Sequence, residues 1–166
     1  MSDHPAVPPV TSPENLQSSN QLSSDQLAAN QLAATHAAAF EATRSWSAAE
    51  FDALLSSRLC FATGDARCFA LVRVVADEAE LLTIATHPDY QRQGLARQVM
   101  RDWHRIAQAR GAHQAFLEVA ADNTAAQALY QSCDYDIVAT RAQYYARENA
   151  PSVDAQVMRR TFSDQS

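Results

Sequence analysis

Patterns that define several large protein classes are missing from this chain of 166 residues. No run of about 18 consecutive apolar residues occurs, which excludes a candidate membrane span. The three cysteines, Cys60, Cys68 and Cys133, are odd in number and show no Cys-x-x-Cys spacing, and the five histidines form no close pair. The sequence therefore predicts neither a disulfide framework nor a bound metal. Unpaired cysteines of this kind are typical of reduced, cytosolic proteins.

Signals for export and for nucleic-acid binding are also missing. The N-terminus lacks the basic and apolar segments of a secretory signal, so we expect a cytoplasmic protein. Lys and Arg number 13 against 19 Asp and Glu, which gives a net charge of −6. Because phosphate contacts need clustered basic side chains, this balance disfavours a nucleic-acid partner. We expect no membrane partner either, and a monomer or a weak dimer.

The beginning of the chain differs in composition from the rest. Four prolines lie within residues 1–14, and residues 15–34 read NLQSS, NQLSS, DQLAA and NQLAA, with a period of five. Such a period advances around a helix by about 140° beyond a full turn, so its leucines do not line one face. We predict a disordered, low-complexity tail at 1–24, one globular domain at 25–162 and a short tail at 163–166. The last repeat units are expected to merge into a first helix ending near residue 40, in preference to forming a separate docking segment.

Hydrophobic periodicity predicts one sheet with helices around it. Ser47 and Glu50 have the spacing of a capping box, with Trp46 and Phe51 as a hydrophobic staple, for a helix that runs to about Ser57. This order of elements predicts an α/β (α+β) fold in a single domain, with a central mixed β-sheet flanked by helices and a right-handed crossover. Strands are expected at 58–64, 67–75, 79–86, 114–120, 135–145 and 155–162, with an irregular stretch before the last, and further helices at 94–110 and 123–133.

One of only three glycines lies in QRQGLA, residues 91–96, between a strand and the long helix. Backbone N–H groups at a helix start are unpaired and carry positive potential, so such a turn binds phosphate. Gly94 lets the backbone approach an anion closely, and Arg92 and Arg97 can pair with further phosphates. GK[ST] and GxGxxG are both absent, so the turn is neither a Walker loop nor a dinucleotide fingerprint. Taken alone, the motif leaves a phosphate site and a plain helix start equally open.

Two longer stretches carry a family resemblance. IATHPDYQRQGLARQVM and FLEVAADNTAAQALYQSCDY resemble the GNAT acyltransferase superfamily, whose acetyl-CoA turn reads Q/R-x-x-G-x-G/A. More narrowly, these blocks, the YY pair at 144–145 and DAQVM at 154–158 are similar to the RimI-type enzymes. Those enzymes acetylate the N-terminal alanine of a small-subunit ribosomal protein. The likeness covers roughly residues 31–162.

The resemblance implies acetyl-CoA as co-substrate and no metal. In this family the turn before the long helix holds the pyrophosphate, and the backbone of the preceding strand aligns the thioester. The asparagine that precedes the later helix contacts the cofactor, although a simple helix cap explains that residue equally well. The resemblance therefore implies ten cofactor-binding residues, which are Ile84, Ala85, Thr86, Arg92, Gln93, Gly94, Leu95, Ala96, Arg97 and Asn123.

Acetyl transfer to an amine needs a base for the ammonium proton and an acid for the departing thiolate. The resemblance implies Glu118 as the base, and partial burial raises a carboxylate pKa in the direction that suits one. Periodicity alone favours a strand glutamate that faces solvent. The resemblance implies Tyr130 as the acid, since a neutral phenol can donate its proton, whereas its context alone favours an aromatic core residue.

The acceptor is expected to be a protein N-terminal α-amine, with the ribosomal protein as the partner. The resemblance places Trp46, Tyr144 and Tyr145 beside it, although ordinary core positions explain them equally well. Cys133 has no paired base nearby in the sequence, so we expect direct attack without a covalent intermediate. Two rival functions remain: acetylation of a small-molecule amine, and a non-catalytic CoA-binding module.

Two positions depart from the family pattern. The usual Ser-Leu-Gly-Phe reads Ser-Cys-Asp-Tyr at residues 132–135, so Asp134 replaces the glycine that ends a helix in the left-handed conformation. We expect a small loss of stability there and no loss of activity. His87 stands where the family often has an acidic residue, and we interpret it as a surface residue rather than a second base.

Overall fold

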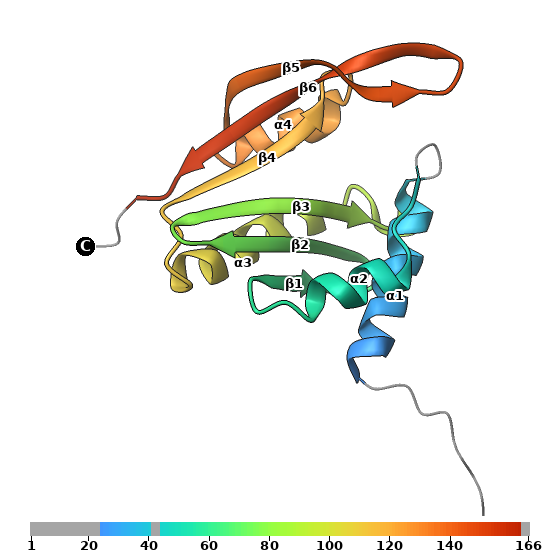
Figure 1. Cartoon of the computed structure of the whole chain (residues 1–166), viewed down its shortest axis with the longest axis vertical. Helices are drawn as coiled ribbons and strands as arrows, with labels where there is room; N and C mark the ends of the chain where they lie inside the picture. The colour runs from blue at the N-terminus through green and yellow to red at the C-terminus, as the bar shows by residue number, and fades with distance from the viewer. Residues whose placement is uncertain (1–23, 41–43, 164–166) are drawn as a thin grey trace, which may run out of the picture.

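This computed structural model describes residues 24–40 and 44–163 of the chain. Helices and strands alternate along it in the predicted order (Figure 1). The predicted tails therefore lie almost wholly outside the described residues. The elements are α1 (Ser24–Ala39), α2 (Ala48–Leu55), β1 (Cys60–Gly64), β2 (Cys68–Val75), β3 (Glu78–Thr86), the 3₁₀ helix η1 (Pro88–Tyr90), α3 (Leu95–Ala109), β4 (Gln114–Ala120), α4 (Thr124–Ser132), β5 (Asp136–Arg147) and β6 (Ala150–Thr161).

The strands form one mixed sheet in the order β1-β2-β3-β4-β6-β5. Neighbouring strands are antiparallel except β3 and β4, which are parallel. These two pair only from Glu78–Gln114 to Glu80–Phe116 and then diverge, so that the sheet forks between them (Figure 1). Beyond the fork, the facing edges of β3 and β4 have no strand partner within the described sheet. Their backbone groups there are therefore available to a ligand.

Different helices cover the two faces of the sheet. α3 and α4 pack on one face, where Trp103, Met100 and Leu117 belong to the larger core cluster. α1 and α2 pack on the other face and bury Phe51 and Phe69 in a smaller cluster. Figure 1 shows α1 and α2 beside β1 to β3, whereas no described helix covers β4 to β6 on that face. Half of this face is therefore open.

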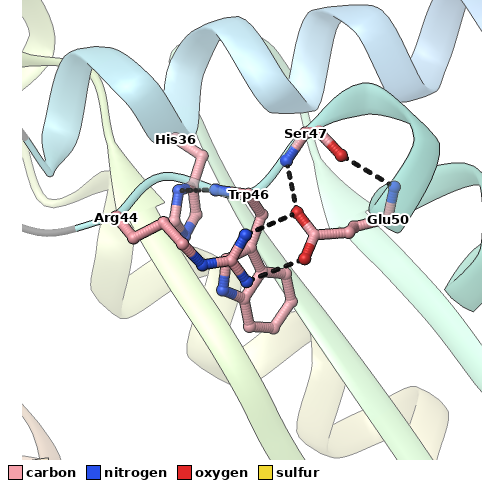
Figure 2. A network of polar contacts seen from close by, with 5 residues as sticks. All are labelled: His36, Arg44, Trp46, Ser47 and Glu50. Atoms are coloured by element: carbon pink, nitrogen blue, oxygen red, sulfur yellow. Dashed lines mark hydrogen bonds and ion pairs between the residues drawn. The ribbon is translucent and has the colours of Figure 1, made fainter.

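A polar network around His36 joins α1 to the start of α2 (Figure 2). The Glu50 N–H donates to Ser47 Oγ at 3.2 Å and the Ser47 N–H donates to Glu50 Oε2 at 2.7 Å, which confirms the predicted capping box. Arg44 pairs with the same carboxylate at 2.7 Å, and the Trp46 N–H donates to His36 Nδ1 at 3.3 Å. Burial lowers the pKa of His36, and Arg44 lowers it further. A neutral ring thus remains able to accept this hydrogen bond.

Several local predictions are confirmed. The Trp46 and Phe51 rings lie 5.6 Å apart across the start of α2, as a hydrophobic staple requires. Gly111, with φ of 96°, follows the last turn of α3 as a helix-ending glycine. α1 begins at Ser24, so the last two repeat units, residues 25–34, are helical. Asp134 has φ of 66°, the left-handed conformation in which the family pattern has glycine.

The predicted irregular stretch before the last strand is wrong. β5 continues to Arg147 and β6 begins at Ala150, so the two strands form a hairpin with a two-residue turn. The pairing between Arg141 and Tyr145 is shifted by a bulge, where Gln143 has φ of 53°. The Gln143 N–H donates to a carboxylate oxygen of Asp154 at 2.8 Å. A bulge breaks the two-residue alternation on which the sequence prediction depended.

A buried polar network fastens α3 to the end of the chain. His104 is 4% exposed, and its Nε2 lies 2.8 Å from the Tyr135 hydroxyl. The Arg160 guanidinium lies 3.1 Å from His104 Nδ1 and also donates to the carbonyl oxygen of Cys133 at 3.1 Å. A guanidinium can only donate, so Nδ1 accepts and the ring proton resides on Nε2. Burial and Arg160 lower the pKa of His104 to about 3, which keeps the ring neutral.

Candidate functional site

The turn before α3 has an unusual backbone. Arg92 and Gly94 both adopt the left-handed region, with φ of 61° and 77°. Gly94 caps α3 without a side-chain hydrogen bond, and no acidic side chain lies in the first turn of the helix. The first N–H groups of α3 therefore have no side chain to accept from them. They also carry the positive end of the helix dipole, which favours an anion.

Open space adjoins this turn. A Cβ at Gly94 would meet no atom within 4 Å, so the backbone is approachable there. A groove of about 520 Å³, here named the α3 groove, runs along it between the end of β3, the starts of α3 and α4, and the end of α1. Among the predicted cofactor residues, the groove is lined by Ile84, Ala85, Thr86, Arg92, Gly94, Leu95, Ala96 and Arg97.

Two predicted cofactor residues do not line the α3 groove. Gln93 is exposed in the turn. Asn123 caps α4, where its side-chain oxygen accepts from the Ala126 N–H at 3.2 Å. The helix cap predicted for Asn123 is therefore confirmed, and its contact with a cofactor stays a prediction.

The sequence analysis missed several residues that line the α3 groove. Ala125, Ala126 and Leu129 do so from α4. Their spacing of three and four residues, which places side chains on one helix face, was a usable signal. Phe40 and Tyr90 also line the groove. Phe40 is far away in the sequence, and only the packing of α1 beside β3 brings it there.

Glu118 stands at the fork of the sheet. It points to the face opposite α3 and α4, because its neighbours Leu117 and Val119 belong to the core on the other side. It is also the first residue on that face beyond Phe116, the last β4 residue to pair with β3. The Glu118 side chain is 28% exposed, and its Oε1 lies 3.1 Å from a guanidinium nitrogen of Arg141. The structure thus provides an ion-paired, half-buried carboxylate at the fork.

Tyr130 lies on α4 and is 6% exposed. Burial raises the pKa of this phenol well above its usual range, and the neighbouring Tyr145 and Cys133 raise it further. The hydroxyl therefore keeps its proton at neutral pH, as a proton donor must.

Tyr145 links the two candidate groups. Burial raises the pKa of Tyr145, and the Glu118 carboxylate raises it further, while Tyr145 in turn raises the pKa of Tyr130. Tyr144 is 52% exposed and packs edge-on against the Tyr145 ring at 5.1 Å. The guanidinium of Arg141 lies 5.4 Å from the centre of the Tyr144 ring. The β5–β6 hairpin therefore places Tyr144 beside Arg141, the ion-pair partner of Glu118.

Trp46 is placed differently. Its ring stacks on His36 at 5.4 Å and belongs to the aromatic cluster under α1 and α2. Its contact with an acceptor stays a prediction.

His87 caps η1, accepting from the Asp89 N–H at 3.2 Å, and its ring lies 5.8 Å from that of Tyr90. These contacts explain His87 as a structural residue of the turn.

Taken together, these parts can bind an anion and exchange protons. The turn offers unpaired N–H groups with Arg92 and Arg97 beside them. A carboxylate, Glu118, lies at the fork, and a neutral phenol, Tyr130, is buried on α4. Within the described residues, no group of three or more His, Cys, Asp or Glu side chains is suited to a metal. None of the helices described here is both long and apolar enough to cross a membrane.

Comparisons with known proteins show the family and the fold. The family model "Acetyltransferase (GNAT) family" matches residues 29–135. The [ribosomal protein bS18]-alanine N-acetyltransferase of Escherichia coli K12 is 44% identical over 82 residues, which is 49% of this chain and 55% of that protein. The chain thus matches about half the length of this curated relative.

Solved structures extend the likeness over most of the chain. The crystal structure of the ribosomal-protein-S18-alanine N-acetyltransferase from Escherichia coli has a TM-score of 0.73 at 31% identity, covering 83% of this chain and 90% of that one. Arabidopsis thaliana NAA60 in complex with acetyl-CoA has a TM-score of 0.70 at 14% identity, covering 82% of this chain and 94% of that one. At that identity the second likeness shows the fold alone.

Proposed function

This protein belongs to the acetyltransferase (GNAT) family, and from that we propose that it transfers an acetyl group from acetyl-CoA to the N-terminal α-amine of a protein. The observation that carries the proposal is the presence, in one domain, of an uncapped helix start beside an open groove, a carboxylate at the fork of the sheet and a neutral phenol on α4. The helix start suits a pyrophosphate, and the carboxylate and the phenol suit proton transfer.

The α3 groove suits the cofactor in charge and in shape. The N–H groups at the start of α3 would hold the pyrophosphate, and Arg92 and Arg97 would pair with its remaining charge. The open space at Gly94 allows the close approach that such bonds require. The unpaired edge of β3 at Ile84 to Thr86 would receive the amide groups of the pantetheine arm. Bound there, acetyl-CoA supplies an activated acetyl thioester.

We assign the two proton transfers to Glu118 and Tyr130. Glu118 would take the ammonium proton, directly or through a water, which frees the lone pair that attacks the thioester carbon. As the carbon–nitrogen bond forms and the carbon–sulfur bond breaks, Tyr130 would donate its proton to the departing sulfur. Arg141 holds the Glu118 carboxylate at the fork.

For the acceptor, we propose an N-terminal alanine, in the first instance that of ribosomal protein bS18. The support is the name of the relatives, which are bS18-alanine N-acetyltransferases. The presence of Tyr144 and Tyr145 on β5, the strand of Arg141, also favours a peptide backbone as acceptor, since phenols bind peptide groups by hydrogen bonds. We also propose that Asn123 contacts the cofactor and that Trp46 contacts the acceptor.

The test is an acetyl-CoA consumption assay with alanine-first, serine-first and methionine-first peptides and a panel of small amines. The chain contains no lysine, because all 13 basic residues are arginine. Acetylation of its own side-chain amines therefore cannot mimic turnover. We expect the alanine-first peptide to be preferred. A preference for small amines would refute the acceptor, and cofactor binding without turnover on any acceptor would refute the activity.

Variants of Glu118 and Tyr130 test the roles assigned to them. Glu118→Gln and Tyr130→Phe should each lower kcat about 100-fold, because general acid–base groups contribute on the order of 10² to 10⁴. The KM for acetyl-CoA should stay within about twofold, since neither side chain lines the α3 groove. Glu148→Gln, in the exposed turn of the hairpin, is the matched control and should retain full turnover. Full activity in both site variants would remove the proposed acid–base pair.

A further inference from the structure

A second groove lies on the open half of the sheet. It has a volume of about 490 Å³ and is lined by residues of β2, β3, β4, β5 and β6, with the residue before β1 at its rim. It opens on the face where Phe116 and Glu118 point, opposite α3 and α4. We name it the sheet groove. No described helix covers it (Figure 1).

The floor and rim of the sheet groove are apolar. Phe116 and Val157 are half-buried in its floor. Leu59 and Val75 line it with 49% and 50% of their surfaces exposed. An apolar floor under exposed aliphatic side chains gains free energy when another chain covers it.

The sheet groove leads to the proposed base. Glu118 lines it, together with Arg141, the partner of that carboxylate. The groove is therefore continuous with the place where the acceptor amine must lie. The α3 groove, which would hold the cofactor, shares none of its lining residues. The two substrates can thus occupy separate grooves at once.

The charge of the sheet groove is slightly acidic. Arg73 pairs with Glu80, and Arg141 pairs with Glu118. Glu78 is a third carboxylate, and its side chain accepts a hydrogen bond from neutral Gln114 at 3.0 Å. The lining therefore carries one more carboxylate than guanidinium, in a molecule whose net charge is −6. A basic polypeptide segment is complementary to such a surface.

From these observations we propose that the sheet groove binds the residues that follow the acetylated one in the acceptor protein, and that it favours a basic segment there. This inference rests on the proposed function. The distance from β4 across β3 to β2 is about two strand spacings, roughly 10 Å, which an extended chain covers in about three residues. Residues two to five of the acceptor would therefore run from Glu118 towards Val75.

The experiment compares acceptors of different length. One is an alanine-first dipeptide amide, which ends near Glu118, and the other is an octapeptide with the same first two residues and arginines at positions three to six. For the wild-type chain, kcat/KM should be at least tenfold higher for the octapeptide. Val75→Arg, which places bulk and positive charge on the rim, should lower kcat/KM for the octapeptide about tenfold. Its effect on the dipeptide should be less than twofold.

Val138→Arg is the matched control. Val138 is 43% exposed on β5 and does not line the sheet groove, so its replacement should leave both kcat/KM values unchanged. Thermal melts of both variants check that the fold is retained. Equal octapeptide activity in wild type and Val75→Arg would overturn the proposed docking surface while leaving the proposed function intact. Failure of the wild type on both peptides would overturn both proposals.

Light scattering, which measures the oligomeric state, tests whether a second copy of this chain occupies the sheet groove instead. If Val75→Arg instead dissociates an oligomer and leaves kcat/KM unchanged for both peptides, the sheet groove is an interface between copies of this chain. That result would overturn its assignment to the acceptor.

Discussion

The buried histidine of α3 should make the protein sensitive to mild acid. His104 is 4% exposed, between the Tyr135 hydroxyl and the Arg160 guanidinium. Its pKa is lowered from 6.5 to about 3 by burial first and by Arg160 second. The unfolded chain therefore binds a proton that the folded chain does not. The stability is present above pH 6.5 and is lost as the pH falls below that value.

The size of the effect follows from the two pKa values. One pKa unit corresponds to about 1.36 kcal/mol. A pH of 5 lies about 1.5 units below the pKa of this histidine in the unfolded chain. His104 should therefore lower the free energy of unfolding by about 2 kcal/mol between pH 7 and pH 5. The native pKa has almost no influence on this figure while it stays well below 5. Urea denaturation at pH 7, 6 and 5 measures it directly.

A variant isolates this contribution. His104→Gln cannot be protonated, so it should lose about 2 kcal/mol of the pH dependence between pH 7 and pH 5, whatever its stability at pH 7. The buried His36 has a lowered pKa and acts in the same direction, but it is present in both proteins and cancels. His113→Gln, at an exposed position, is the control. Equal pH dependence in wild type and His104→Gln would refute the reasoning.

Four substitutions at residues with positive φ give further predictions. Gly94→Ala should lower stability by about 1 kcal/mol because φ is 77°, and calorimetry should show weaker acetyl-CoA binding; Gly111→Ala, with φ of 96° and equally open space, should lose similar stability and keep its affinity. Gly64→Ala should lose at least about 2 kcal/mol in urea denaturation, since its Cβ would lie 2.2 Å from the Cys68 carbonyl oxygen. Asp134→Gly should raise the melting temperature by a few degrees, because glycine adopts a φ of 66° without the steric strain of a side chain. The substitution removes only the ion pair at 4.0 Å between the exposed Asp134 carboxylate and Arg160. A Gly111→Ala variant with equally weakened cofactor binding, a stable Gly64→Ala variant or an unchanged Asp134→Gly melting temperature would contradict the respective arguments.

Local interactions explain why much of the fold was predictable. The capping box at Ser47 and Glu50, the helix-ending Gly111 and the cap at Asn123 each depend on residues within a few positions of one another. Apolar alternation on β4 likewise matches its burial. The sheet is mixed, as the order of elements predicted, with β3 and β4 parallel and the other neighbours antiparallel. The β5–β6 hairpin escaped prediction because a bulge at Gln143 and a side-chain contact from a distant residue interrupt the pattern.

In the candidate site, too, some residues were predictable from local motifs and others are brought in only by tertiary packing. The turn at Gly94 is local, so its motif pointed to Arg92 and to Gly94, Leu95, Ala96 and Arg97 of the α3 groove, and the family resemblance added Ile84, Ala85 and Thr86. Phe40 joins that groove from a different helix, and Arg141 reaches Glu118 from a different strand. Neither has a signal in its own segment. The sheet groove belongs to no motif either, since it combines residues of five strands.

The sequence by itself determined the order of helices and strands and, through two motif-bearing stretches, the membership of the GNAT family. The order of elements is encoded by side-chain periodicity and by local capping and turn signals, where neighbours along the chain supply the physical cause. The anion-binding turn and the two proton-transfer residues stay predictions, which the family resemblance carries. Only the tertiary structure decided where β3 and β4 part, which face Glu118 points to, and that Arg141 of β5 pairs with Glu118. These depend on the register between strands and on which half of a sheet the helices cover. Both are settled by packing among residues far apart in the chain.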